Sequence, residues 1–207
     1  MLSQDYQKFE VVLVYVGNND DFFADIKSLQ RLYPHLTPVH IDYSPHYPVS
    51  TKIALNVGIK SAKHDFVIIT SSDATPSSER WLSLLAKGFM YGDIVLGYCG
   101  IEQQKGFANF IFREYEFNDS AAWLSSAIRN KTYSASRNAL GFKKSLYFDV
   151  RGFNHLNMNV GENDLFVQQI ATRDNVSVVL SPRATCTERT WGGWSWRWRR
   201  TKLSHTT

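Results

Sequence analysis

The sequence has few cysteines and lacks the segments that mark export or membrane insertion. Cys99 and Cys186 are its two cysteines, and neither lies in a Cys-x-x-Cys pair of the kind that binds zinc or exchanges disulfides. The chain does not open with a charged and then apolar leader, and no apolar run approaches the roughly 18 residues that a membrane helix needs. We therefore expect a soluble protein with buried, reduced thiols in a reducing compartment.

An excess of charge of one sign is also missing. The 23 lysines and arginines against 19 aspartates and glutamates give a net charge of +4, which is too small over 207 residues to indicate nucleic-acid binding by itself. With 43% hydrophobic and 20% charged residues, the composition excludes a disordered or low-complexity chain. We find no internal repeat and no linker, so we expect a single domain.

Short β-rich runs alternate with helical patterns along the chain. We expect strands at residues 11–16, 37–41, 66–70 and 93–99, with helices at 20–32, 51–63 and 78–89. In the less regular second half we expect a long or broken helix at 107–128, an extended stretch at 133–142, a helix at 164–172 and a strand at 176–180. The apolar runs 11–16 and 66–70 should be buried strands. This alternation predicts an α/β fold with a parallel-rich sheet and helices on both faces.

Asp73 stands in the turn that follows the expected strand 66–70. Open α/β sheets bind ligands at the carboxyl ends of their strands, where a carboxylate can hold a hard divalent cation if substrate oxygens complete its coordination shell. Ser72 and Asp73 are equally suited to capping the helix expected after the turn. The local pattern alone does not separate a metal ligand from a helix cap.

Two acids, Glu162 and Asp164, follow a glycine and precede the apolar pair Leu165 and Phe166. One of them can act as a general base toward an acceptor hydroxyl, because a second acid nearby raises its pKa. Acids are also common in the first turn of a helix, where they interact with the helix dipole. Taken alone, the segment favours this structural interpretation.

The densest aromatic segment is residues 191–200, which hold four of the six tryptophans and three arginines. Arginine binds phosphate through two parallel hydrogen bonds, and tryptophan offers a rigid surface for a sugar or a base. Clustering of this density is difficult to explain by core packing. A surface helix that touches a membrane, or a nucleic-acid contact, is the competing interpretation.

Five segments resemble, in the same order, motifs of the GT-A fold glycosyltransferases of family 2, especially their bacterial membrane-associated branch. Residues 51–60 resemble the Lys-x-x-Ala-Leu-Asn-x-Gly-Ile segment of that family, and residues 70–76 resemble its Thr-Asp-Ala-Asp-x-x-Pro element. Residues 136–145 resemble its Arg-Asn-Leu-Ala-Tyr-Arg-Lys-Ser stretch, and residues 161–166 its Gly-Asp-Asp-Asp-Leu-Phe acid motif. Residues 191–200 stand where the family has a Gln-x-x-Arg-Trp-like element. The resemblance covers nearly the whole chain.

The resemblance implies one GT-A-like domain over residues 1–207, in which a mixed sheet is flanked by helices, with a donor-binding half at 1–100 and an acceptor and catalytic half at 101–207. The implied enzyme moves a sugar, with inversion, from a nucleotide diphosphate donor to a hydroxyl of a glycan or lipid-linked acceptor, as in the synthesis of cell-envelope polysaccharide. A Mg²⁺ or Mn²⁺ ion assists by holding the diphosphate. The implied location is cytoplasmic, at the inner face of the membrane to which full-length relatives are anchored, and no nucleic acid is expected as a partner.

The same resemblance implies roles for individual residues. Asp73 would hold the metal ion, and Asp164, or in second place Glu162, would deprotonate the acceptor. Lys52 and Asn56 would lie near the nucleotide. The residues that would close over the diphosphate of the donor are Arg197, Trp198, Arg199 and Arg200.

The chain departs from the family's pattern at several positions. Val16 stands where relatives carry an aspartate that holds the base, Ser71 replaces the first acid of the Asp-x-Asp pair, and Asn163 replaces the central acid of the third motif. Losing a carboxylate weakens metal binding. The family's first strand has no counterpart, so we expect a sheet with two unpaired edges. Two other functions stay open: a non-catalytic descendant that binds a glycan or a partner, and a membrane or polyanion binder that acts through residues 191–200.

Overall fold

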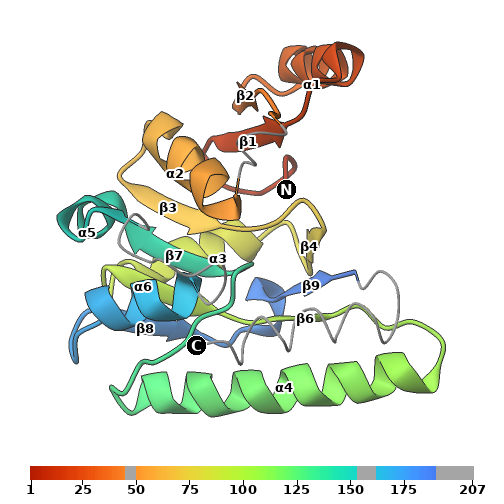
Figure 1. Cartoon of the computed structure of the whole chain (residues 1–207). Helices are drawn as coiled ribbons and strands as arrows, with labels where there is room; N and C mark the ends of the chain where they lie inside the picture. The colour runs from red at the N-terminus through yellow and green to blue at the C-terminus, as the bar shows by residue number, and fades with distance from the viewer. Residues whose placement is uncertain (45–49, 153–161, 190–207) are drawn as a thin grey trace.

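The computed structural model describes residues 1–44, 50–152 and 162–189 (Figure 1). Its helices are α1 Asp20–Leu32, α2 Thr51–Ser61, α3 Trp81–Gly88, α4 Phe107–Ile128, α5 Lys144–Asp149 and α6 Glu162–Ile170. Its strands are β1 Val11–Val16, β2 Leu36–Ile41, β3 Phe66–Ile69, β4 Ala74–Pro76, β5 Ile94–Gly97, β6 Cys99–Ile101, β7 Leu140–Lys143, β8 Val176–Val179 and β9 Cys186–Glu188. None of the described helices is long and apolar enough to cross a bilayer.

The strands form three sheets. β1 and β2 make a parallel pair, β3-β7-β5-β8 make a four-stranded sheet, and β4-β9-β6 make a three-stranded one. β7 runs antiparallel to both of its neighbours, whereas β5 and β8 are parallel. The parallel-rich sheet expected from the alternation of elements is therefore corrected to a mixed one. The direction of β7 is set by the return of the chain after α4, which an apolar run of four residues does not reveal.

Several short elements differ from those expected. The expected strand 93–99 is divided at Tyr98 into β5, which pairs with β7 and β8, and β6, which pairs with β9. β4, β9 and α5 were not expected, and the stretch 133–142 becomes a strand only from Leu140. Strands of three residues depend on pairing with distant segments, so local patterns do not signal them.

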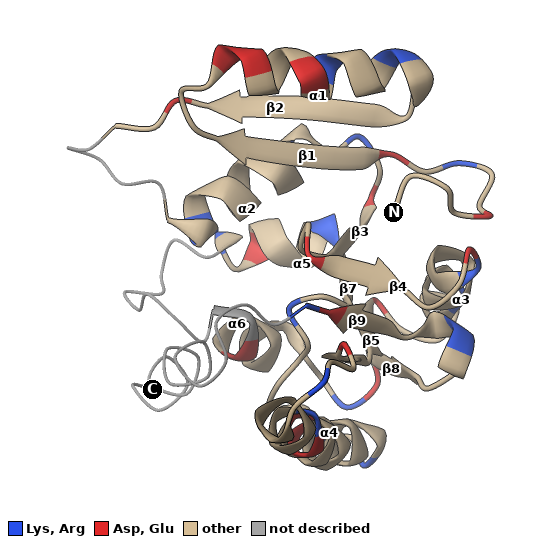
Figure 2. Ribbon diagram, turned by 90° about the vertical axis from the view of Figure 1, so that its right-hand side faces the viewer, with Lys and Arg blue, Asp and Glu red and all other residues tan. Residues whose placement is uncertain are grey.

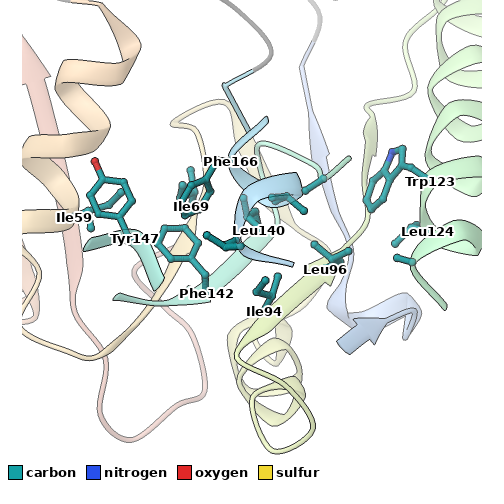
Figure 3. Packing of buried hydrophobic residues seen from close by; sticks show 14 residues of the cluster. Ile59, Ile69, Ile94, Leu96, Trp123, Leu124, Leu140, Phe142, Tyr147 and Phe166 are labelled. Atoms are coloured by element: carbon teal, nitrogen blue, oxygen red, sulfur yellow. The ribbon is translucent and has the colours of Figure 1, made fainter. Parts of the chain in front are cut away.

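The main core lies on one face of the four-stranded sheet (Figure 3). There Phe142 of β7 contacts Tyr147 of α5 and Phe166 of α6, with ring centroids 6.2 and 5.0 Å apart, respectively. Trp123 of α4 joins the same cluster. Val95 of β5 points to the opposite face, toward α3, because side chains alternate along a strand. Helices therefore cover both faces of this sheet.

The β1–β2 pair is less enclosed. Every residue of β1 is only partly buried, and Phe66 at the start of β3 is 46% exposed. The expectation of a buried strand is therefore wrong for β1 and holds for β3 only at Ile69, because each strand has a neighbour on one side only among the described residues. Within the described residues β1 is bonded to β2 alone and β3 to β7 alone. A cavity of about 690 Å³ lies between the two strands.

Candidate active site

The turn between β3 and β4 carries Asp73. Its side chain is exposed, and the next residue, Ala74, is buried and opens β4. β4 pairs antiparallel with β9, so Ala74 lies opposite Glu188. A strand follows this turn, and α3 begins only at Trp81, without a side-chain cap. The interpretation of Ser72 and Asp73 as caps of the following helix is therefore wrong.

A buried polar network holds this turn. The Oδ1 atom of Asn138, a residue 1% exposed, accepts a hydrogen bond from the backbone N–H of Ser71 at 3.1 Å. The Nδ2 atom of Asn138 donates to the carboxylate of Glu188, which is 7% exposed. The hydroxyl oxygens of Thr70 and Ser71 are buried and have no hydrogen-bond partner among the described residues. Since a buried carboxylate is stable only when it is hydrogen-bonded, Asn138 and Glu188 depend on each other.

No role was expected for Asn138 or Glu188. Glu188 ends a strand of three residues whose partners, β4 and β6, lie far away along the chain, and no local pattern marks it. Asn138 belongs to the segment 136–145, which resembles a family motif and directly precedes β7. The pair Arg137-Asn138 in this motif was the sequence signal that could have identified Asn138.

Asp164 lies in the first turn of α6 and is partly buried. Its Oδ1 atom accepts hydrogen bonds from the Ser134 hydroxyl at 2.7 Å and from the backbone N–H of Ala135 at 3.4 Å. Both of these bonds go to Oδ1, so among the described residues Oδ2 remains to accept another donor. Burial, together with the negative charges of Asp119 and Asp164, raises the pKa of Tyr133.

Residues 134–138 connect the two acidic positions. Asp164 is bonded to Ala135 near one end of this segment, and Asn138 is bonded to the turn of Asp73 at the other end. Because each residue advances the chain by at most about 3.6 Å, the Cα atoms of Ala135 and Asn138 are no more than about 11 Å apart. The structure thus attaches α6 and the β3–β4 turn to a single connection between α4 and β7.

Two of the other expected site residues lie on α2, and the rest fall outside the described part of the chain. Lys52 and Asn56 lie in the first two turns of α2, behind the N-cap Ser50. Asn56 accepts a hydrogen bond from the Tyr147 hydroxyl at 3.1 Å, which ties α2 to α5. The residues outside the described part are Arg197, Trp198, Arg199 and Arg200, together with the side chain of Glu162.

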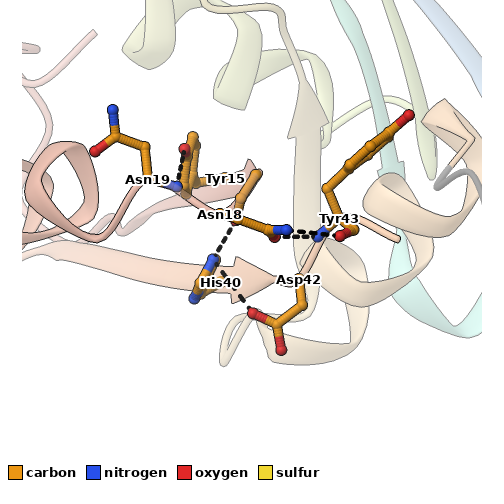
Figure 4. Close-up of polar contacts among 7 residues, drawn as sticks. Tyr15, Asn18, Asn19, His40, Asp42 and Tyr43 are labelled. Carbon is orange, nitrogen blue, oxygen red and sulfur yellow. Dashed lines mark hydrogen bonds and ion pairs between the residues drawn. The ribbon is translucent and has the colours of Figure 1, made fainter. Parts of the chain in front are cut away.

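A second polar group lies at the carboxyl ends of β1 and β2 (Figure 4). The side-chain amide of Asn18 exchanges two hydrogen bonds with the backbone of Tyr43, at 2.8 and 2.7 Å. The His40 ring contacts the carbonyl oxygen of Gly17 at 2.6 Å and the carboxylate of Asp42 at 3.7 Å. Ligands of α/β proteins bind at this edge of a parallel pair. No role was expected for these side chains, although Asn18 follows the expected strand 11–16 and Asp42 and Tyr43 follow the expected strand 37–41.

The described residues supply few metal ligands. No three of their His, Cys, Asp and Glu side chains are grouped closely enough to hold a metal ion. Asp73 and the buried Ser71 hydroxyl offer two hard oxygen donors, which suit Mg²⁺ or Mn²⁺ only if other ligands complete the shell. This donor set fits a cation that binds together with a phosphate-bearing substrate, and it does not fit a resident metal site.

The sequence profile described as glycosyl transferase family 21 matches residues 1–203. The chain belongs to this family. The resemblance to glycosyltransferases that the sequence motifs carry is thereby confirmed. No curated protein matches this family 21 chain.

Solved glycosyltransferases share the fold of this family 21 chain. The mannosyltransferase PcManGT of Pyrobaculum calidifontis, solved with GDP-Man and Mn²⁺, superposes with a TM-score of 0.71 and 21% identity over 98% of this chain and 55% of its own. Residues 1–349 of S. aureus TarS, solved with UDP-GlcNAc, give a TM-score of 0.65 and 17% identity over 95% and 54%. The mixed α/β, GT-A-like fold is therefore confirmed. The chain spans about half the length of either structure.

Proposed function

We propose that this chain transfers a sugar from a nucleotide diphosphate donor to an acceptor hydroxyl with inversion. The observation that carries the proposal is the attachment of Asp164 and the Asp73 turn to one short connection, residues 134–138. Family membership supports the reaction type, and the donors solved with PcManGT and TarS support the class of donor. The acceptor in this proposal is a glycan or a lipid-linked sugar at the inner face of a membrane.

Asp164 is the base in this reaction. Its Oδ2 atom takes the proton of the acceptor hydroxyl while the acceptor oxygen forms a bond to the anomeric carbon of the donor. The bond from that carbon to the phosphate oxygen breaks on the opposite face, and the nucleoside diphosphate leaves with the electron pair. Ser134 and Ala135 fix the carboxylate through Oδ1, so the base is oriented before the acceptor arrives. Glu162 is the second choice for this role.

Asp73 helps to stabilise the leaving nucleoside diphosphate. Its exposed carboxylate and the Ser71 hydroxyl would hold a Mg²⁺ or Mn²⁺ ion that arrives with the donor. Such an ion supplies positive charge to the diphosphate as it leaves. Lys52 and the final cluster, Arg197, Trp198, Arg199 and Arg200, provide further positive charge and a stacking surface for the donor. Because Ser71 stands in place of an acid, the cation binds more weakly than it would to a pair of carboxylates.

The test separates donor binding from transfer. GDP-Man and UDP-GlcNAc, each with Mn²⁺, are titrated while the Tm and the release of GDP or UDP are followed. We expect one donor to raise the Tm, and Asp73→Ala to abolish that rise. Asp164→Asn should keep the rise but reduce nucleotide release by about 10²–10⁴-fold, which is the usual contribution of a general base. Asp174→Asn, at an exposed position beyond the C-terminal end of α6, is the matched control. Unchanged release in Asp164→Asn would overturn the assignment.

A non-catalytic glycosyltransferase-like domain is the second candidate. Two observations favour it: Ser71 and Asn163 replace family acids, and the described residues contain no metal-binding group of three. Saturable binding of a donor or a glycan to the unsubstituted protein, without release of nucleotide, would identify this second candidate.

A further inference from the structure

A second cavity, the α4 hollow, lies between α4 and the strands β6 and β9. Its volume is about 380 Å³, and its lining includes Arg113, Glu114 and Phe117 from α4 and Thr187 from β9. α4 contacts β6 and runs below it in Figure 1, and Figure 2 shows that this helix carries residues of both charges. The α4 hollow therefore brings an aromatic ring together with a basic and an acidic side chain.

Two aromatic rings form perpendicular walls of the α4 hollow. The rings of Tyr98 and Phe117 meet edge to face, with their centroids 6.4 Å apart and an angle of 86° between their planes. A Cβ atom on Gly100 would lie 2.6 Å from the Tyr98 hydroxyl oxygen, so that hydroxyl lies directly over the strand because residue 100 has no side chain. Phe117 is 56% exposed, so much of its ring is available to a ligand.

The polar side chains of the α4 hollow are available for binding. Within the described ranges, the Arg113 guanidinium, the Glu114 carboxylate and the Tyr98 hydroxyl form no hydrogen bond or ion pair with another residue. Successive residues of a helix point about 100° apart, so Arg113 and Glu114 line the hollow without pairing with each other. Burial, followed by the negative charge of Glu116, raises the pKa of Tyr98, so its hydroxyl keeps its proton and can donate.

These groups together favour a neutral ligand that is rich in hydroxyls. The described lining holds one positive and one negative charge, so it repels a phosphate through Glu114 and a cation through Arg113. The guanidinium offers hydrogen-bond donors and the carboxylate offers acceptors, and adjacent hydroxyls of a sugar can use both. The flat face of Phe117 suits the C–H groups on one side of a sugar ring.

We propose that the α4 hollow binds one neutral sugar residue, which stacks on Phe117 and bonds through its hydroxyls to the polar side chains of the lining. The outer face of the three-stranded sheet leads from this site to the Asp73 turn, because Gly100, Thr187 and Thr75 lie side by side across β6, β9 and β4. Measured along this path, Gly100 is about 16 Å from Asp73. In the proposed transferase the bound sugar is a residue of the acceptor glycan other than the one that reacts. This assignment rests on the proposed function, whereas the binding itself does not.

The probes are the methyl glycosides of mannose, glucose and N-acetylglucosamine, titrated without a nucleotide donor or Mn²⁺. We expect at least one of them to bind saturably in saturation-transfer NMR, and we expect excess inorganic phosphate not to displace it. Failure of every glycoside to bind, or displacement by phosphate, would overturn the proposal. Nucleotide release without glycoside binding would contradict this site alone, whereas glycoside binding without nucleotide release would contradict the proposed function alone.

Substitutions on α4 and β6 locate the binding. Phe117→Ala removes the stacking surface and should weaken glycoside binding about tenfold. Phe110→Ala, on the same helix at a position that is 55% exposed and outside the lining, is the matched control and should bind normally. Gly100→Ala should also weaken binding, because its Cβ atom displaces the Tyr98 hydroxyl, and Tyr98→Phe removes that hydroxyl without adding volume. Equal losses in Phe117→Ala and Phe110→Ala, or unchanged binding in a Phe117→Ala protein that circular dichroism shows to be folded, would contradict the proposal.

Discussion

The strands β1 and β5 come from sequence runs of the same kind, yet the molecule uses them differently. Ile94, Val95 and Leu96 of β5 are completely buried, whereas no residue of β1 is more than partly buried. In the part of the chain that the structure describes, β5 has a neighbouring strand on each side, β7 and β8, and β1 has only β2. The burial of a strand therefore depends on its neighbours as much as on its own apolar residues.

The helices of the two regions differ in burial in the same way as the strands. α1, beside the β1–β2 pair, buries only Ile26 of its 13 residues. α4, which covers the four-stranded sheet, buries six residues, including Phe112, Trp123 and Leu124. The catalytic acid that we propose, Asp164, belongs to the well-packed region, and the cavity between β1 and β3 borders the less enclosed one. The two regions of the described structure therefore differ in how completely helices and neighbouring strands cover them.

Truncation of a core ring should produce the largest loss of stability. Phe142 is completely buried among Tyr147 and Phe166, so Phe142→Ala should lower the free energy of unfolding by about 3–5 kcal/mol. Val14→Ala on β1 should cost about 1 kcal/mol or less, because Val14 is already partly exposed. Equilibrium unfolding in urea measures both. A loss for Val14→Ala close to that for Phe142→Ala would show that the β1 region is as tightly packed as the β5 region.

The sequence predicted those features of the fold that local patterns encode. The helices α1 and α4 begin and end at the expected residues, and the long strands lie where β-rich runs occur. Asn19 caps α1 and two aspartates follow it, which are signals that act within one turn. The antiparallel direction of β7 and the strands β4 and β9 depend on pairing between distant segments, and they could not be predicted locally.

In the candidate site, too, some residues could be identified from local sequence patterns and others could not. Asp73 and Asp164 could be singled out because they stand beside apolar runs and within segments that resemble family motifs. Their roles as metal ligand and base stay predictions. Glu188 could not be found, because a buried carboxylate is recognisable only once its hydrogen-bond partner is known, whereas Asn138 was signalled only by the motif that its segment resembles. Asn56 acquires a contact with Tyr147 that depends on the packing of α2 against α5.

Removal of the Asn138 amide should have an intermediate effect and should affect binding as well as stability. Asn138→Ala leaves the Ser71 N–H without this acceptor and removes one donor from the buried Glu188 carboxylate, so we expect a loss of about 1–3 kcal/mol. The Asp73 turn should also lose its position, which weakens the Mn²⁺-dependent Tm rise produced by a bound donor. Asn118→Ala, on the exposed side of α4, is the control and should cost below about 0.5 kcal/mol. Equal losses from the two variants would contradict a positioning role for Asn138.

The smallest expected effect is a dependence of stability on alkaline pH that originates in the well-packed region. Cys99 and Cys186 are free and buried opposite each other on β6 and β9, and hydrogen bonding to Cys186, together with burial, raises the pKa of the Cys99 thiol above its ordinary value of 9.0. The unfolded chain therefore releases this proton near pH 9 while the folded chain retains it. Stability conferred by the neutral thiol is present below that pH and falls as the pH rises, by at most about 1.4 kcal/mol per pH unit for one group. Cys99→Ala should flatten the fall in urea unfolding measured between pH 8 and pH 10, a window set by that ordinary value. If the slope is unchanged in Cys99→Ala, the pH dependence comes from another group, and the burial of this thiol does not distinguish the two regions.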